Sequence, residues 1–188
     1  MSISSRLRRV LLVISLLSLP ALAAGQESLA PPAPIRLTVH SGVLDEDRVA
    51  WVRTPRSYAD GKGSYPVLYL TDGDMHINEI GNTIDFLADN RRIPELIVVG
   101  IANADRARDL APAQGGDEFL RFVESELMPE VEKRYRTQPF RVFAGHSLGG
   151  LLVVHALAAR PALFNAYIAV SPSLQDGKEA ELRRVENS

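Results

Sequence analysis

The hydrophobic positions of the chain fall into two alternating kinds of segment, and this alternation predicts the fold class. Four continuous apolar runs have the pattern of strands that are buried on both faces. They are residues 66–74, 96–103, 140–145 and 166–173. Between them lie three segments with apolar residues at helical spacing. They are residues 78–90, 117–135 and 148–159. Strands that alternate with helices predict an α/β sandwich with a mostly parallel sheet.

Two shorter segments precede the first buried run. Residues 35–41 alternate apolar and polar side chains, as a half-buried strand does, and residues 49–55 resemble a second strand. The turn-like residues between them allow the two to pair as a hairpin. Farther along, Pro129 is expected to bend the helix over residues 117–135, and Pro161 is expected to stop the last helix.

The first part of the chain has the pattern of an export signal. Three arginines precede an apolar run at residues 10–19, and small residues follow it, which predicts a signal peptide over 1–23. An uncleaved membrane anchor is the alternative, although the run is shorter than the roughly 20 residues that a spanning helix needs. Residues 24–34 are predicted to be a proline-rich linker and 35–188 one domain. We therefore expect an exported protein, periplasmic or secreted, with no stable membrane span after cleavage.

Composition excludes several kinds of chemistry. The 188 residues suffice for one domain, and the net charge of −2 gives no electrostatic reason to expect a nucleic-acid partner. The sequence has no cysteine, which rules out disulfides, thiolate metal sites and a cysteine nucleophile. No metal or cofactor motif is found, and a small molecule is the expected partner.

A G-x-S-x-G motif is the main candidate for catalysis. It runs from Gly145 to Gly149, directly after an apolar strand and directly before an apolar helix. In that context the motif is typical of a nucleophile elbow, which places Ser147 at the carboxyl end of the sheet as a nucleophile. The alternative is a glycine-rich turn that only packs the helix against the strand.

An oxyanion hole needs two N–H donors that point at one oxygen. The residue after the nucleophile, Leu148, is expected to supply one. The loop after the strand at residues 66–74 is expected to supply the other, because Gly73 would let the backbone turn so that the N–H of Asp74 points into the site. Alternatively, Asp72 and Asp74 are a turn pair that caps the strand end.

Four segments together resemble a known family. They are "YPVLYLTDGDMH", "IPELIVVGIANADRARDLAP", "RTQPFRVFAGHSLGG" and "FNAYIAVSPSL". In this order they are similar to the putative-esterase family of α/β-hydrolases, which includes esterase D, bacterial siderophore esterases and mycolyltransferases. The likeness extends over about residues 41–174 and is nearest to the siderophore-esterase branch. It implies a three-layer α/β-hydrolase sandwich with an N-terminal hairpin, the nucleophile Ser147, and backbone donors from Leu148 and Asp74.

The chain departs from the family pattern at its end. In the family, the catalytic histidine and the acid lie beyond the "SPSL" segment, whereas this sequence stops at Ser188. The resemblance therefore implies a C-terminally truncated domain that lacks the last strands and helices, with the base and acid absent from this chain. Asp176 follows the last predicted strand too closely to serve as the acid and is expected to be a solvated charge.

The four histidines do not supply an obvious base. His155 lies eight residues beyond Ser147 on the same helix, about 12 Å along its axis at 1.5 Å per residue, which is too far. His40 is expected to be structural, and His146 is expected to point away from Ser147. His76 is the only arguable candidate, and we expect it to line the pocket.

A charged loop follows the strand at 96–103 and is open to two interpretations. Asp105, Arg106, Arg108 and Asp109 would lie at the carboxyl end of the sheet, where they could bind a polar or anionic substrate. The alternative is a local network of ion pairs that fixes the loop.

Three functions follow from these observations. The first is a serine hydrolase that acts on carboxylic esters, such as a siderophore or another small ester, through an acyl-serine intermediate. The second is an acyltransferase of the same family. The third is a truncated, non-catalytic remnant of the fold, because two of the catalytic roles have no residue in this chain.

Overall fold

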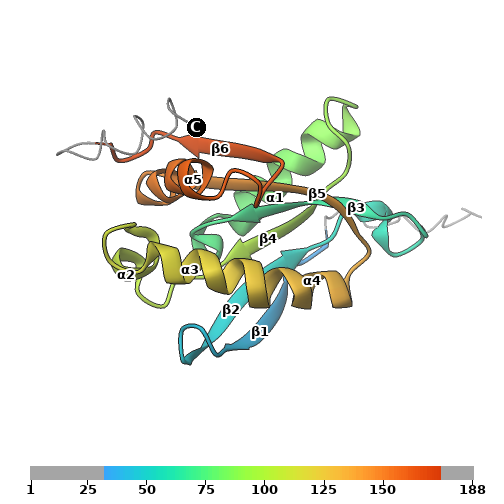
Figure 1. Cartoon of the computed structure of the whole chain (residues 1–188). Coiled ribbons are helices and arrows are strands. Elements are labelled where there is room, and N and C mark those ends of the chain that lie inside the picture. Colours follow the sequence, from blue (N-terminus) through green and yellow to red (C-terminus); the bar gives the residue numbers. More distant parts are fainter. Residues whose placement is uncertain (1–31, 175–188) are drawn as a thin grey trace, which may run out of the picture.

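The computed structural model of the protein describes residues 32–174. These residues form one six-stranded sheet with helices on both faces, which confirms the predicted α/β class (Figure 1). The predicted signal peptide and most of the predicted linker lie outside the described residues, as does Asp176.

The sheet is mostly parallel, with one hairpin at its side. Its strands are β1 (Ile35–Ser41), β2 (Glu46–Arg53), β3 (Tyr65–Leu70), β4 (Ile97–Ile101), β5 (Thr137–His146) and β6 (Ala166–Val170). They lie in the order β1-β2-β4-β3-β5-β6. β4, β3, β5 and β6 run parallel, and β2 runs antiparallel to both of its neighbours. The predicted hairpin of the first two strands is therefore confirmed.

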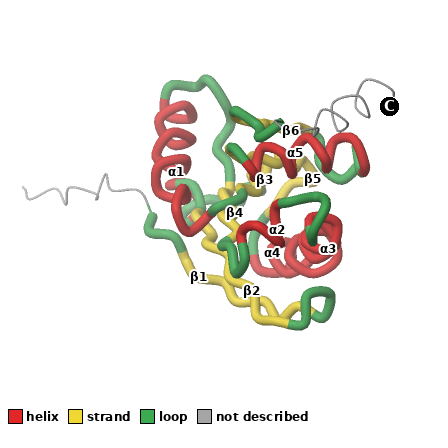
Figure 2. Tube along the Cα trace, turned by 90° about the vertical axis from the view of Figure 1, so that its left-hand side faces the viewer, coloured by secondary structure: helices red, strands yellow, loops and turns green. Residues whose placement is uncertain are grey.

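The helices separate into two layers. They are η1 (Arg56–Tyr58), α1 (Gly73–Asp89), α2 (Arg106–Leu110), α3 (Gly116–Phe122), η2 (Val123–Leu127), α4 (Met128–Arg134) and α5 (Leu148–Ala159). Figure 2 shows α1 on one side of the sheet and α2, α3, α4 and α5 on the other. The larger core lies on the side of α3, η2, α4 and α5, and a smaller one lies under α1.

The predicted helices form, but two of them differ from the prediction. The segment at 117–135 is divided into α3, the π-helical turn η2 and α4. Pro129 stands in the first turn of α4, where its missing N–H interrupts the ladder of helical hydrogen bonds. Helix α1 begins at Gly73, five residues before the predicted start, because the strand before it already ends at Leu70.

β6 is the last strand of the sheet in the described part of the chain. On the α1 side, Ile168 and Val170 of this strand are each 49% exposed. Two apolar hollows of about 360 and 320 Å³ adjoin there, and both are lined by Leu68, Ile84 and Ile168. This face is an open, apolar surface beside the last strand of the described chain. Among residues 32–174, no helix has the length and apolar character to cross a bilayer.

Candidate active site

Ser147 lies on the sharp turn between β5 and α5. Its backbone angles, φ 57° and ψ −115°, are unusual for a residue with a side chain. Its N–H donates to the Val170 carbonyl at 3.0 Å, and its own carbonyl accepts from the N–H groups of Leu151 and Ser173, both at 3.0 Å. The predicted strained strand-to-helix turn is confirmed, and the surrounding backbone holds it in place.

The two glycines of the motif are required by close packing. A Cβ atom on Gly145 would lie 2.5 Å from the carbonyl carbon of Gly149 and 2.8 Å from Thr71 Oγ1. Real Cβ atoms do not approach other atoms this closely, so β5 and α5 can meet at the turn only without side chains at these positions. The motif therefore forms the tight elbow that the sequence predicts.

The hydroxyl of Ser147 has a partner that the sequence analysis missed. Ser147 Oγ lies 3.1 Å from Ser173 Oγ, in the connection that follows β6. Across residues 32–174, no histidine is hydrogen-bonded to this hydroxyl. Ser173 could have been found from topology, because the segment after a strand next to β5 must lie beside the residue that follows β5.

Two histidines are engaged far from the elbow. His155 is buried on α5, and its Nε2 lies 2.8 Å from Asp117 Oδ1. His40 is exposed on the hairpin, where its Nδ1 lies 2.9 Å from Asp47 Oδ1. Neither histidine is therefore bonded to the nucleophile elbow.

The other two histidines line the apolar hollow of about 360 Å³ under α1. His146 is the last residue of β5, and His76 is in the first turns of α1, with its Nδ1 3.5 Å from Glu79 Oε2. Gly145 of the elbow also lines this hollow. His76 therefore lines a hollow beside the elbow, and its place in the substrate pocket stays a prediction.

The two predicted oxyanion donors stand at the starts of two helices. Leu148 is the first residue of α5, and Asp74 is the second residue of α1. N–H groups at these positions have no acceptor within their own helix, and the helix dipole gives them a positive potential. These positions place each N–H group at the start of a helix. Convergence of the two N–H groups on one oxygen stays a prediction.

Gly73 has a different role from the predicted one. The residue with left-handed backbone angles is Asp72, with φ 54° and ψ 40°, and the turn is therefore made one residue earlier. A Cβ atom on Gly73 would lie 2.0 Å from the carbonyl carbon of Gly100 in β4. Gly73 is thus needed for the close contact of α1 with the sheet, whereas Asp72 tolerates the left-handed turn, as aspartate often does.

The Asp72 side chain is buried and points to the connection after β4. Its carboxylate accepts from Asn103 Nδ2 at 2.6 Å and from Arg106 Nε at 2.6 Å and Nη2 at 3.1 Å. The hydrogen bond to Asp72 raises the pKa of Arg106. Asp72 does not cap α1 with its side chain. This carboxylate therefore links two loops at the carboxyl end of the sheet.

The rest of the charged loop forms ion pairs within the protein. Asp105 caps α2 by accepting from the N–H of Arg108 at 3.1 Å. Arg108 pairs with Glu46 at 2.6 Å and with the buried Asp109 at 2.7 Å. The buried Arg48 reaches the same two carboxylates, each at 2.7 Å. Of the two interpretations of this loop, the structure favours the ion-pair network.

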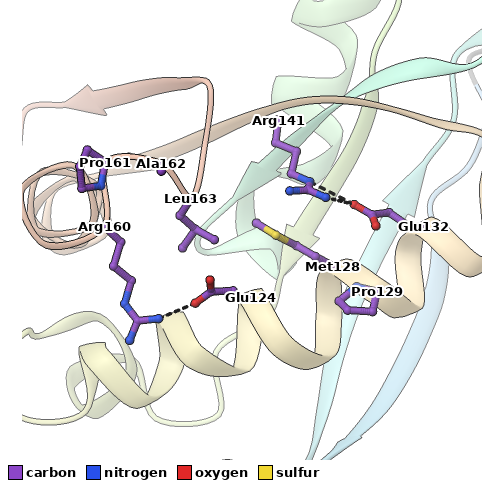
Figure 3. A pocket seen from close by; sticks show the side chains of 9 residues that line it. All are labelled: Glu124, Met128, Pro129, Glu132, Arg141, Arg160, Pro161, Ala162 and Leu163. Atoms are coloured by element: carbon purple, nitrogen blue, oxygen red, sulfur yellow. Dashed lines mark hydrogen bonds and ion pairs between the residues drawn. The ribbon is translucent and has the colours of Figure 1, made fainter.

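A hollow of about 450 Å³ lies between the helices η2 and α4 and the connection from α5 to β6 (Figure 3). Two arginines face it, and both are neutralised. Arg160 pairs with Glu124 at 2.6 Å, and Arg141 of β5 pairs with Glu132. Arg141 lies in the first half of β5, whereas Ser147 follows the end of that strand. Ser147 does not line this hollow, which therefore lies away from the elbow. Within residues 32–174, no group of three or more acidic or histidine side chains could hold a metal ion.

The comparisons with known proteins agree with this geometry. Residues 41–178 match the family model described as "Putative esterase". The chain is 32% identical over 155 residues to ferri-bacillibactin esterase BesA of Bacillus subtilis, covering 65% of this chain and 53% of the relative. It is 30% identical over 171 residues to a siderophore triacetylfusarinine C esterase of Aspergillus fumigatus, covering 76% and 59%.

The crystal structure of an IroE-like serine hydrolase from Shewanella oneidensis superposes with a TM-score of 0.77 at 32% identity. The match covers 82% of this chain and 55% of that one. The chain thus spans about half the length of the relatives it matches. With its sheet order, its strained serine elbow and these matches, the chain belongs to the Putative esterase family.

Proposed function

We propose that this chain carries the nucleophile and oxyanion donors of a serine ester hydrolase. Ser147 Oγ attacks the ester carbonyl carbon, and its proton passes to a general base. The tetrahedral oxyanion is stabilised by the Leu148 and Asp74 N–H groups and collapses to an acyl-serine as the alcohol leaves with a proton. Water then releases the acid and restores the serine.

The strained elbow of Ser147 is the observation that supports this function most strongly. A residue with a side chain at φ 57° and ψ −115° costs about 1–3 kcal/mol and persists only where its surroundings fix it. Ser147 lies at the carboxyl end of β5, directly before the first residue of α5. A turn that served packing alone would not need this conformation.

The substrate class comes from the relatives. Their names describe esterases of ferri-bacillibactin, triacetylfusarinine C and salmochelin, all of which are siderophores. We propose a small ester of this kind as the substrate, with no cofactor. The general base and the acid are proposed to lie outside the described residues, and export through the segment 1–23 is part of the same proposal.

Covalent labelling of the serine tests the proposal. The purified chain is incubated with an alkyl fluorophosphonate and, separately, with a p-nitrophenyl ester. We expect slow labelling, which is lost in Ser147→Ala and kept in Ser173→Ala, together with slow hydrolysis of the ester. Without a base, an oxyanion hole and substrate binding still leave a rate about 10³–10⁴ times that of the reaction in water.

Three other results would change the proposal. Equal labelling of the Ser147→Ala variant by the fluorophosphonate would refute the nucleophile. Turnover at ordinary esterase rates, about 1–10³ per second, would show that this chain supplies its own base. Transfer of the acyl group to an added alcohol faster than to water would identify an acyltransferase.

A further inference from the structure

The oxyanion loop is held by a residue outside it. The loop passes from β3 into α1 through Asp72, whose carbonyl accepts from the N–H groups of Met75 and His76 at 3.0 and 3.1 Å. These bonds form the first turn of α1, which carries the Asp74 N–H. The position of the Asp74 N–H therefore depends on how firmly Asp72 keeps its left-handed conformation.

Nothing in α1 itself fixes the Asp72 side chain. Its carboxylate is 2% exposed and does not cap the helix. It is held by Arg106, which donates twice, and by Asn103, and both come from the connection after β4. Two parallel N–H donors from one guanidinium fix the orientation of a carboxylate as well as its charge.

The same carboxylate lies against the nucleophile elbow. Asp72 Oδ2 is 3.2 Å from the point where a Cβ atom on Gly149 would lie, and Gly149 is the second residue of α5. A negative charge at this place opposes a second negative charge on the reacting oxygen. Arg106 neutralises the carboxylate, so its charge does not act against the oxyanion.

We propose that Arg106 is a positioning residue for the oxyanion hole. Through Asp72 it fixes the first turn of α1 and, with it, the Asp74 N–H, and it neutralises the carboxylate beside α5. This inference rests on the proposed function for its catalytic consequence, but its structural part can be measured without any catalysis.

Arg108 provides a matched control. The side chains of Arg106 and Arg108 are 40% and 39% exposed, and each pairs with one buried aspartate, Asp72 or Asp109. Arg108 is two residues farther along α2, and its carboxylate partners, Asp109 and Glu46, lie outside the loop between β3 and α1. Alanine at either position removes the ion pair with one buried aspartate, and at Arg108 it also removes the pair with Glu46, but only Arg106→Ala removes a partner of Asp72.

The test measures amide hydrogen exchange of Met75 and His76, whose N–H groups report on Asp72 directly. We expect exchange at least tenfold faster in Arg106→Ala, an intermediate rate in Arg106→Lys, and the wild-type rate in Arg108→Ala. Lysine keeps the charge but loses the paired donation, so it separates orientation from neutralisation. If Arg106→Ala does not fold, the comparison of Arg106→Lys with wild type decides the matter.

The second readout is phosphonylation of Ser147 by the fluorophosphonate, in which Ser147 Oγ bonds to phosphorus and fluoride leaves. We expect the rate at saturating probe to fall about 10- to 100-fold in Arg106→Ala with little change in the half-saturating concentration, because a misplaced donor acts on the oxyanion and not on binding. Wild-type rates of exchange and phosphonylation in the Arg106 variants, or equal effects of Arg108→Ala, would overturn the inference. Failure of the proposed function has a different signature, which is labelling that persists in Ser147→Ala.

Discussion

Thr71 and Gly149 are in contact across the elbow. A Cβ atom on Gly149 would lie 2.1 Å from Thr71 Oγ1 and 3.1 Å from Thr71 Cβ. The Thr71 hydroxyl is buried and has no hydrogen-bond partner in the described part of the chain. The end of β3 and the start of α5 therefore fit together by shape, and the absence of a side chain at residue 149 makes the fit possible.

This contact predicts that a substitution at Thr71 partly restores the stability that is lost by a substitution at Gly149. We expect Gly149→Ala to lower the free energy of unfolding by about 1–3 kcal/mol, as overpacking of a tight site does. Thr71→Ala removes the clashing oxygen without breaking a hydrogen bond, so the double variant should regain part of the loss. Denaturant unfolding of the four proteins gives the coupling energy.

Gly63→Ala is the control for this series. A Cβ atom there would meet only Tyr65 Oη, at 3.9 Å, which is an ordinary contact. Its stability should stay within about 0.5 kcal/mol of wild type, as is usual for surface substitutions. Strictly additive effects of Gly149→Ala and Thr71→Ala would show that the two residues do not compete for space.

The strained backbone of Ser147 predicts a gain in stability at the expense of the nucleophile. Ser147→Gly and Ser147→Ala both remove the hydroxyl, but only glycine adopts φ 57° and ψ −115° without strain. We expect the glycine variant to be more stable than the alanine variant by about 1 kcal/mol, the strain relief being partly offset by the flexibility of glycine in the unfolded chain. Thermal unfolding of the two variants measures the difference, and an alanine variant that is equally stable would argue against strain.

Local patterns in the sequence predict much of the fold. Helix α5 has the predicted bounds, and the order of hairpin, strands and helices is as expected, because continuous apolar runs and helical spacing are local signals. The elbow is also local, since the strand, the turn and the helix are contiguous. Helix α1 begins earlier than the sequence predicts, because β3 already ends at Leu70 and Asp72 makes the left-handed turn, for which an aspartate is a weaker sequence signal than a glycine.

What the sequence does not predict depends on contacts between distant segments. The pairing of Arg106 with Asp72 and the bond between Ser147 and Ser173 join residues that are 34 and 26 positions apart. Alternating charges in residues 105–109 indicate ion pairs but not their partners. The π-helical turn η2 was also missed, because Pro129 predicts an interruption without saying which residues take it up.

Loss of the hydroxyl is expected to change the free energy of unfolding differently at Tyr69, which is buried, and at Tyr167, which is half-buried. The Tyr69 hydroxyl has no hydrogen-bond partner among residues 32–174, and burial raises the pKa of Tyr69 well above its ordinary value. The Tyr167 hydroxyl donates to the Arg160 carbonyl at 2.9 Å and accepts from the Phe164 N–H at 3.2 Å. One hydroxyl is therefore a desolvated polar group and the other a bonded one.

Tyr69→Phe should leave the free energy of unfolding unchanged or raise it by about 1 kcal/mol, because a buried group without a partner is costly. Tyr167→Phe should lower it by about 1 kcal/mol, the usual contribution of a bonded hydroxyl. Denaturant unfolding at neutral pH, where both phenols are protonated, measures the two changes. A clear loss of stability in Tyr69→Phe would mean that its hydroxyl has a partner in solution, such as a water molecule.

The hydrogen bonds of Glu46 predict how the free energy of unfolding depends on pH. Its carboxylate accepts from Arg108 and from Arg48, and these hydrogen bonds lower the pKa of Glu46 below its ordinary value of 4.5, with the bond from Arg108 as the larger cause. A carboxyl group with a lowered pKa in the folded state binds protons less readily there than in the unfolded chain. Its contribution to stability is therefore complete above a pH of about 4.5 and is lost as the pH falls through the folded-state pKa.

Glu46→Gln removes this titration. At pH 7 the variant should be less stable by about 1 kcal/mol, because the two arginines lose a charged acceptor and the pair is partly exposed. Between about pH 5 and 3 its stability should fall less steeply than that of wild type, so the two curves approach each other in acid. Parallel curves for wild type and Glu46→Gln would show that Glu46 titrates as in the unfolded chain and that its pairing with Arg108 is fully screened by solvent.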